Sequence, residues 1–197
     1  MKLNAIAYIR SGLVLSRKTA QSSLPLHYPL LTLRSVHPKG YIEPEKLETF
    51  SADNALNPDY LSQTGDIIVR LSAPYTAILI RPDTQGIVIS SNFVRIQPDS
   101  RKLSPGYLFW LLNTPAVRRR IYQDATSNML GAVKASWFAN FDVPSLSLDQ
   151  QNQIAALNEL TREEIRILNR LADEKEKYYH YLIQKFHDSI TGKDGLR

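Results

Sequence analysis

The 197-residue sequence contains no cysteine, which excludes disulfide bonds, thiolate catalysis and cysteine-based zinc sites. It also lacks long apolar runs, because no window approaches the roughly 18 uncharged apolar residues of a membrane-spanning helix. The N-terminal segment carries Lys2 and Arg10 between short apolar runs, so it lacks the continuous apolar stretch of a secretory signal. We therefore expect a cytoplasmic protein that does not associate with membranes.

The motifs of common enzyme classes are missing as well. Neither a glycine-rich phosphate-binding loop nor a G-x-S-x-G nucleophile motif occurs. His180 and His187 share a face of a predicted helix but have no third metal ligand. Asp66 follows Gly65 directly before an apolar run, which indicates a turn-closing aspartate rather than a general base. Because no nucleophile, base and orienting group come together, we predict no catalytic residue, no metal site and no enzymatic activity.

Charge and proline divide the chain into two parts. The net charge is +5, but residues 1–145 hold 16 Lys and Arg against 10 Asp and Glu (+6), and residues 146–197 hold 8 against 9 (−1). All 11 prolines lie at or before Pro144. The basic excess favours an anionic partner for the first part, although a plain solubility surface is the alternative. We predict domains over residues 1–146, 147–190 and 191–197: a compact domain, one long helix and a tail.

The first part shows short apolar runs bounded by turn residues, as strands do. The predicted strands are Ala5–Ile9, Leu30–Leu33, Asp66–Leu71, Ala77–Ile80, Gly86–Ile89 and Phe93–Ile96. A helix is expected to follow, with Ser104 as its N-cap and Pro105 in its first turn. The run Asn113–Thr114–Pro115 should end it, and a second helix is predicted over Ala116–Tyr122. This mixture predicts an α/β (α+β) domain.

The second part has the pattern of a single long amphipathic helix. Ser147 and Gln150 have the spacing of a capping box, and apolar residues then recur every three or four positions. A helix over Asp149–Ile190 would be roughly 63 Å long, more than a domain of this size can cover. We therefore predict an antiparallel coiled coil, with a helix wrapped over its own domain as the alternative. The predicted dimerisation residues are Ile154, Leu157, Ile165, Leu168, Leu171, Leu182 and Phe186.

Basic and amide side chains lie on predicted loops of the first part, close to aromatic residues. Such groups contact phosphates and base edges, with Arg typically pairing with guanine and Asn with adenine. The loop over residues 127–135 carries one of these cations near its tip. Ordinary surface charge is the alternative for each residue. The predicted DNA-binding residues are Arg70, Tyr75, Arg81, Asn92 and Lys134.

Four motifs, in this order, resemble a known family. They are L-x-x-I-A-x-I-x-x-G at Leu3–Gly12, Gly-Asp-Ile-Ile at Gly65–Ile68, the Pro-Gly-Tyr-Leu run of Pro105–Leu112, and the Val-Pro…Gln-x-x-Ile-Ala segment Val143–Ala155. Their order and spacing resemble a target recognition domain of the specificity (S) subunits of type I restriction–modification systems. That resemblance implies an α/β domain that reads half of a bipartite DNA site. It also implies a long helix that packs antiparallel against another as a spacer.

The resemblance further implies the partners of the chain. A full S subunit has two recognition domains and two such helices, whereas this sequence has one of each. It therefore implies a half-size subunit that homodimerises and reads a palindromic, interrupted site; a fragment of a two-domain subunit also fits. The implied partners are double-stranded DNA, a second copy, a DNA methyltransferase subunit and a restriction motor subunit. S-adenosylmethionine would be bound by the methyltransferase, so no cofactor is expected here.

Two other interpretations stay open. The chain could be a dimeric scaffold or regulatory module that binds proteins without any DNA sequence preference. Its basic residues would then be scattered over the surface rather than gathered in one place. An enzyme acting on nucleic acid is disfavoured by the missing catalytic set.

Overall fold

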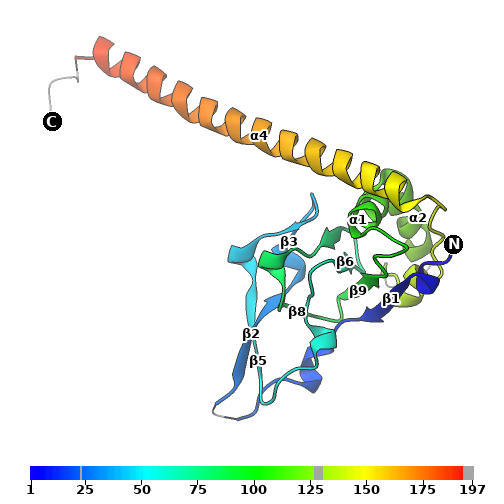
Figure 1. Ribbon diagram of the computed structural model, residues 1–197. Coiled ribbons are helices and arrows are strands. Elements are labelled where there is room, and N and C mark those ends of the chain that lie inside the picture. Colours follow the sequence, from blue (N-terminus) through cyan, green and yellow to red (C-terminus); the bar gives the residue numbers. More distant parts are fainter. Residues whose placement is uncertain (23, 127–130, 193–197) are drawn as a thin grey trace. The chain divides into compact units, whose positions relative to one another are not determined.

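The computed structural model describes residues 1–22, 24–126 and 131–192 (Figure 1). Contacts divide the chain into two compact units, Met1–Ala155 and Ala156–Arg197. Part of the predicted loop over 127–135, namely residues 127–130, lies outside the described residues, as do residues 193–197 of the predicted tail.

A four-stranded sheet forms the centre of the first unit. Its strands are, in spatial order, β1 (Ala7–Ser11), β9 (Phe93–Pro98), β6 (Ile67–Arg70) and β7 (Ala77–Leu79), and all neighbours are antiparallel. The inner strand β6 is an almost continuous apolar run because both of its faces are covered. Predicted strands are thereby confirmed for β6, β7 and β9. The prediction for Ala5–Ile9 was shifted, because Leu3–Ala5 forms a 3-10 turn and β1 begins only at Ala7.

Smaller sheets lie beside this one. In a three-stranded sheet, β2 (Leu26–Leu31) pairs antiparallel with β5 (Glu48–Ala52) and parallel with β8 (Val88–Ile89). A two-stranded sheet joins β3 (Val36–His37) and β4 (Tyr41–Ile42). The strand β5 was not predicted. Short 3-10 helices fill the connections: Leu3–Ala5, Leu15–Arg17, Leu33–Ser35, Pro44–Lys46, Pro58–Tyr60 and Pro82–Thr84.

Three helices follow the strands in the first unit: α1 (Pro105–Asn113), α2 (Pro115–Thr126) and α3 (Ala135–Ala139). The predicted break between the first two is confirmed, since α1 ends at Asn113 and Pro115 opens α2. Ser104 stands at the N-cap of α1 as predicted, but its side chain makes no capping hydrogen bond. Its backbone N–H instead donates to Oε1 of Gln151, at 2.9 Å.

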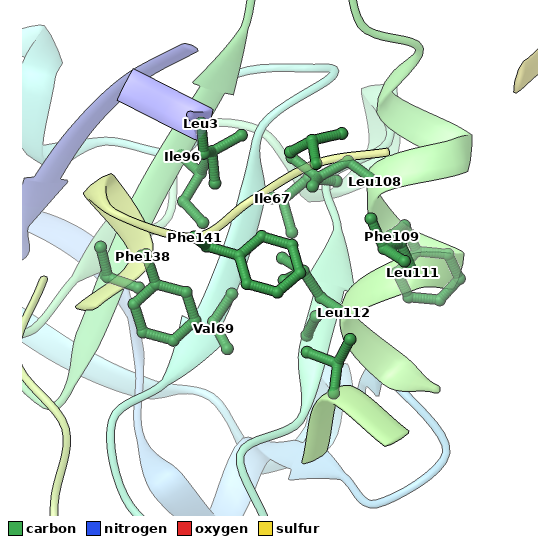
Figure 2. Packing of buried hydrophobic residues seen from close by; sticks show 14 of the residues in the cluster. Leu3, Ile67, Val69, Ile96, Leu108, Phe109, Leu111, Leu112, Phe138 and Phe141 are labelled. Atoms are coloured by element: carbon green, nitrogen blue, oxygen red, sulfur yellow. The ribbon is translucent and has the colours of Figure 1, made fainter. Parts of the chain in front are cut away.

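The alternation of side chains along β6 builds two hydrophobic clusters. Ile67 and Val69 face the cluster that includes α1, α2 and α3, whereas Ile68 faces a second cluster on the other side of the sheet. Figure 2 shows Leu108 and Leu112 of α1, together with Phe138 and Phe141, packed around Ile67 and Val69 of β6. A third cluster packs under β2, β5 and β8. The first cluster fixes the helices on the sheet.

The last helix, α4, runs over Leu148–Ile190. The predicted capping box is present: the Ser147 N–H donates to Gln150 Oε1 at 3.0 Å, and the Gln150 N–H donates to Ser147 Oγ at 3.2 Å. Its first residues, up to Ala155, belong to the first unit. The prediction of a mixed sheet-and-helix domain followed by a long C-terminal helix is confirmed. None of the helices in the described ranges is long and apolar enough to cross a membrane.

Candidate nucleic-acid interface

Two of the predicted DNA-binding residues, Arg70 and Asn92, lie at the same end of the central sheet. Arg70 is the last residue of β6 and pairs in register with Phe93, the first residue of β9. Directly beyond this pair, the Leu71 N–H donates to the carbonyl oxygen of Asn92 at 3.0 Å. Antiparallel pairing thus brings the C-terminal end of β6 and the turn before β9 together.

The segment that precedes α3 joins this end of the sheet. The Val133 N–H donates to the carbonyl oxygen of Leu71 at 2.9 Å, and Ala132 forms a β-bridge with Ser72. Lys134 follows immediately, with an exposed side chain at the N-cap position of α3. Residues from three distant parts of the sequence, near positions 70, 92 and 134, are therefore neighbours.

The Arg70 guanidinium is held in place by backbone carbonyls. Nη2 donates to the carbonyl oxygen of Ala73 at 3.0 Å, and Nη1 donates to that of Leu33 at 3.4 Å. Its Nε is buried and has no hydrogen-bond partner within the described ranges. Burial lowers the pKa of the Arg70 guanidinium, whose ordinary value is so high that it stays charged. Arg70 is thus a half-buried cation with a fixed orientation.

Tyr75 lies in the turn between β6 and β7, next to Arg70, but it is buried, and Arg81 lies elsewhere. Tyr75 is only 3% exposed, and its hydroxyl donates to the carbonyl oxygen of Gly131 at 3.0 Å. Burial, followed by the nearby Tyr122, raises the pKa of this phenol. Tyr75 therefore anchors the segment before Lys134, a position that does not favour direct contact with DNA. Arg81 follows β7, which runs antiparallel to β6, so it lies at the opposite end of the sheet from Arg70.

A cavity of about 390 Å³ opens next to Lys134, between α2 and the start of α3. Arg120 and Trp137 line it, with Arg120 Cζ 6.0 Å from the centre of the indole ring. Trp137 Nε1 donates to a carboxylate oxygen of Asp124 at 2.6 Å, which fixes the indole. Arg120 was not among the predicted DNA-binding residues. Helical periodicity alone does not show which of the three consecutive arginines, Arg118 to Arg120, lines the cavity. The Arg118 side chain points toward α1 instead, where its Nη2 donates to Asn113 Oδ1 at 2.5 Å.

The chemistry of this region suits an anionic polymer. Arg70, Lys134 and Arg120 supply positive charge, Asn92 supplies an amide with both donors and acceptors, and Trp137 lines the cavity beside Arg120. Cations position a phosphate backbone, whereas amides and guanidinium groups can read base edges. Among the described residues, no cluster of His, Asp and Glu has the arrangement of a metal site.

The predicted dimerisation residues fall into two groups. Ile154 is partly buried and packs against the core of the first unit. The other six lie in the second unit with exposed side chains, from 39% exposed for Leu182 to 67% for Phe186. Pairing between two copies of α4 stays a prediction.

No family model matches the sequence, and no curated protein matches it either. Solved structures do resemble its fold. The whole chain superposes on half of a chain from a structure that reports complex assembly and conformational transition of the type I R-M (restriction–modification) system, with a TM-score of 0.70 and 18% identity. It also resembles the HsdS subunit from Thermoanaerobacter tengcongensis, with a TM-score of 0.68 and 19% identity over 96% of this chain and 48% of that one. The chain thus shares the fold of these proteins and spans about half of their length.

Proposed function

We propose that this chain is a sequence-specific DNA-binding specificity subunit of a type I restriction–modification system. The observation that carries the proposal is the likeness in fold, which extends over the recognition-type domain and the long helix together. Two sequence segments that resemble this family lie at β6 and α4 of this chain: Gly65–Ile68 leads into β6, and Val143–Ala155 leads into α4. Fold alone does not determine function, so the proposal also rests on the basic interface around Arg70 and Lys134.

The proposed molecule is a homodimer. Residues 1–146 form the recognition domain, residues 147–190 the dimerising spacer helix and residues 191–197 the tail. Because the chain spans half the length of its structural neighbours, two copies would supply the two halves of a bipartite reader. The proposed partners are a DNA methyltransferase subunit and a restriction motor subunit docked on this scaffold in the cytoplasm. The chain itself would have no catalytic role and no cofactor.

Removing single cations tests whether the proposed interface binds DNA. Lys134→Ala and Arg70→Ala should each weaken binding, and log affinity should depend on log salt with a slope shallower by about one unit for each lost phosphate contact. Fluorescence anisotropy over a salt series measures both quantities. Lys134→Ala is the cleaner variant, because Arg70 also bonds to backbone carbonyls.

Arg101→Ala is the matched control for this test. It removes the same charge from an exposed side chain that follows β9, at the end of that strand remote from Asn92. Its affinity and salt slope should stay close to those of the wild type. Unchanged binding by both Lys134→Ala and Arg70→Ala would place the DNA-binding surface elsewhere. Failure of the wild type to bind duplex DNA would favour the protein-binding scaffold.

A further inference from the structure

Two charged residues interrupt the apolar face of α4 in the second unit. With alternating steps of four and three, this face comprises a seam of eight residues: Leu157, Thr161, Glu164, Leu168, Leu171, Lys175, Tyr178 and Leu182. Glu164 and Lys175 are 11 residues apart, which is close to three helical turns, so they share the seam with the leucines. All eight side chains are exposed.

Neither charge in the seam is neutralised within its own helix. The helix does form ion pairs, between Arg166 and Glu163 at 2.6 Å and between Lys177 and Glu174 at 2.9 Å. In the described part of the chain, however, no ion pair includes Glu164 or Lys175. A helix that covered the seam with apolar residues would strip water from both charges without replacing it, which is costly. The partner helix must therefore present opposite charges at both positions.

We propose that Glu164 and Lys175 set the orientation and register of the helix pair, with Glu164 of each copy facing Lys175 of the partner subunit. This inference rests on the homodimer proposed above. In an antiparallel pair with this register, Leu157 faces Leu182 of the partner subunit and Leu168 faces Leu171 of the partner subunit. The two-fold axis then passes midway between Leu168 and Leu171. A second copy of this chain satisfies every leucine and both charges of the seam.

Other arrangements of two copies leave the charges unsatisfied. A parallel, in-register pair places Glu164 against Glu164 and Lys175 against Lys175 of the partner subunit. An antiparallel pair can slip by one heptad in either direction. Glu164 then faces Leu168 of the partner subunit or Leu182 of the partner subunit. Lys175 then faces Leu157 of the partner subunit or Leu171 of the partner subunit. The two charges thus destabilise the other arrangements and also stabilise the proposed register.

The length of the helix agrees with this register. When Glu164 faces Lys175 of the partner subunit, Asp149 falls opposite Ile190, and α4 itself runs over Leu148–Ile190. The two helices therefore overlap over almost their whole length. A slip of one heptad would leave about 10 Å of each helix without a partner.

Charge reversal in the full chain tests the pair. Glu164→Lys places two lysines face to face, and Lys175→Glu places two glutamates face to face. Each single variant should therefore dimerise at least about tenfold more weakly than the wild type. The double variant Glu164→Lys/Lys175→Glu restores opposite charges and should dimerise nearly as tightly as the wild type. A mixture of the two single variants, one carrying a larger tag, should form mainly the mixed dimer, and analytical ultracentrifugation measures all four.

Asp173→Lys is the control, because it changes the charge as Glu164→Lys does but lies on the far side of the helix from the seam. Its dimer should match the wild type. Circular dichroism should show wild-type helix content for every variant, since the substituted side chains are exposed. A variant that had lost its fold would form no mixed dimer, and that outcome would count against the proposal.

A spin label provides a second measurement, because the chain has no cysteine of its own. With Lys177→Cys labelled in each copy, the proposed register separates the two sites by about 22 Å along the helix axis. A slip of one heptad changes that separation by about 10 Å, and a parallel pair brings it close to zero. Pulsed electron spin resonance distinguishes these cases.

The possible failures can be told apart. A monomeric wild type would overturn both the homodimer and the register. A dimeric wild type whose single variants dimerise normally, with no preference for the mixed dimer, would overturn the register and leave the homodimer standing.

Discussion

The buried Asp66–Arg95 ion pair lies at the end of the sheet opposite the proposed interface. Both side chains are almost fully buried, at 1% and 2% exposed, and the guanidinium donates to the two carboxylate oxygens at 2.5 and 3.3 Å. The Gln63 N–H also donates to the carboxylate, at 2.8 Å. Arg95 pairs in register with Ile68, so the ion pair ties the turn before β6 to β9.

Removing one partner of this pair should destabilise the first unit severely. Asp66→Ala leaves a buried guanidinium without its counter-ion, which we expect to lower the free energy of unfolding by about 3–5 kcal/mol. Urea unfolding followed by tryptophan fluorescence measures this in the first unit, because Trp110 and Trp137 both lie there. Lys46→Ala, which breaks an exposed pair with Glu43, should have a much smaller effect. Equal effects of the two substitutions would contradict this account.

The role of a residue could be predicted from the sequence where it depends only on residues close to it in the sequence. The position of Asp66 after Gly65 predicted a turn-closing aspartate, and its bond from the Gln63 N–H confirms this. Its partner Arg95 lies 29 residues away and could not be found, because nothing in the sequence shows that β6 and β9 are neighbours. Tyr75 was predicted as a DNA-binding residue because aromatic residues lie among basic residues in this part of the sequence, yet its ring is buried.

Among the elements, the start of α4 shows how the long helix is joined to the domain. Gln151 is 3% exposed and uses its whole amide: Oε1 accepts from the Ser104 N–H at 2.9 Å, and Nε2 donates to the carbonyl oxygens of Lys102 at 3.2 Å and Leu146 at 3.1 Å. The same region packs closely, because a Cβ on Gly106 would lie 2.8 Å from the Cβ of Ala155. The first turns of α4 are thereby fixed to the start of α1.

Loss of the Gln151 amide should weaken this junction. Gln151→Ala leaves one buried N–H and two carbonyl groups without their partner, which we expect to lower the free energy of unfolding by about 2–4 kcal/mol. Gln153→Ala, two residues away and exposed, should change it by less than about 0.5 kcal/mol. Urea unfolding of the full chain compares the two variants. If Gln151→Ala left the free energy of unfolding unchanged, the junction would be held by apolar packing instead.

Element boundaries were predictable where sequence signals are strong. The capping box at Ser147, the break at Asn113–Thr114–Pro115 and the long helical periodicity each matched the structure. The strand β5 (Glu48–Ala52) was not predicted, because only one of its faces is apolar and its sequence therefore contains no continuous apolar run. Ile154 was predicted as a dimerisation residue from periodicity, which gives a face of the helix but not the partner of that face. In the structure Ile154 packs on the core of the first unit.

At the scale of the whole molecule, we propose half of a bipartite DNA reader that a second copy completes. The chain spans about half of the solved chains that share its fold. Its basic excess lies in residues 1–145, and residues 146–197, which include the helix that would pair two copies, have a slightly negative net charge. A two-fold homodimer presents two identical interfaces, so its two half-sites must be the same sequence in inverted orientation.

Selection of bound sequences from a pool of random duplexes tests whether the chain reads two identical half-sites. Duplexes retained by the full chain through repeated rounds of mobility-shift selection are sequenced and aligned. We predict enrichment of an inverted repeat, with two copies of one short half-site separated by a gap of fixed length and unspecified sequence. Retention of DNA without any enriched sequence, or enrichment of one unrepeated site, would contradict it.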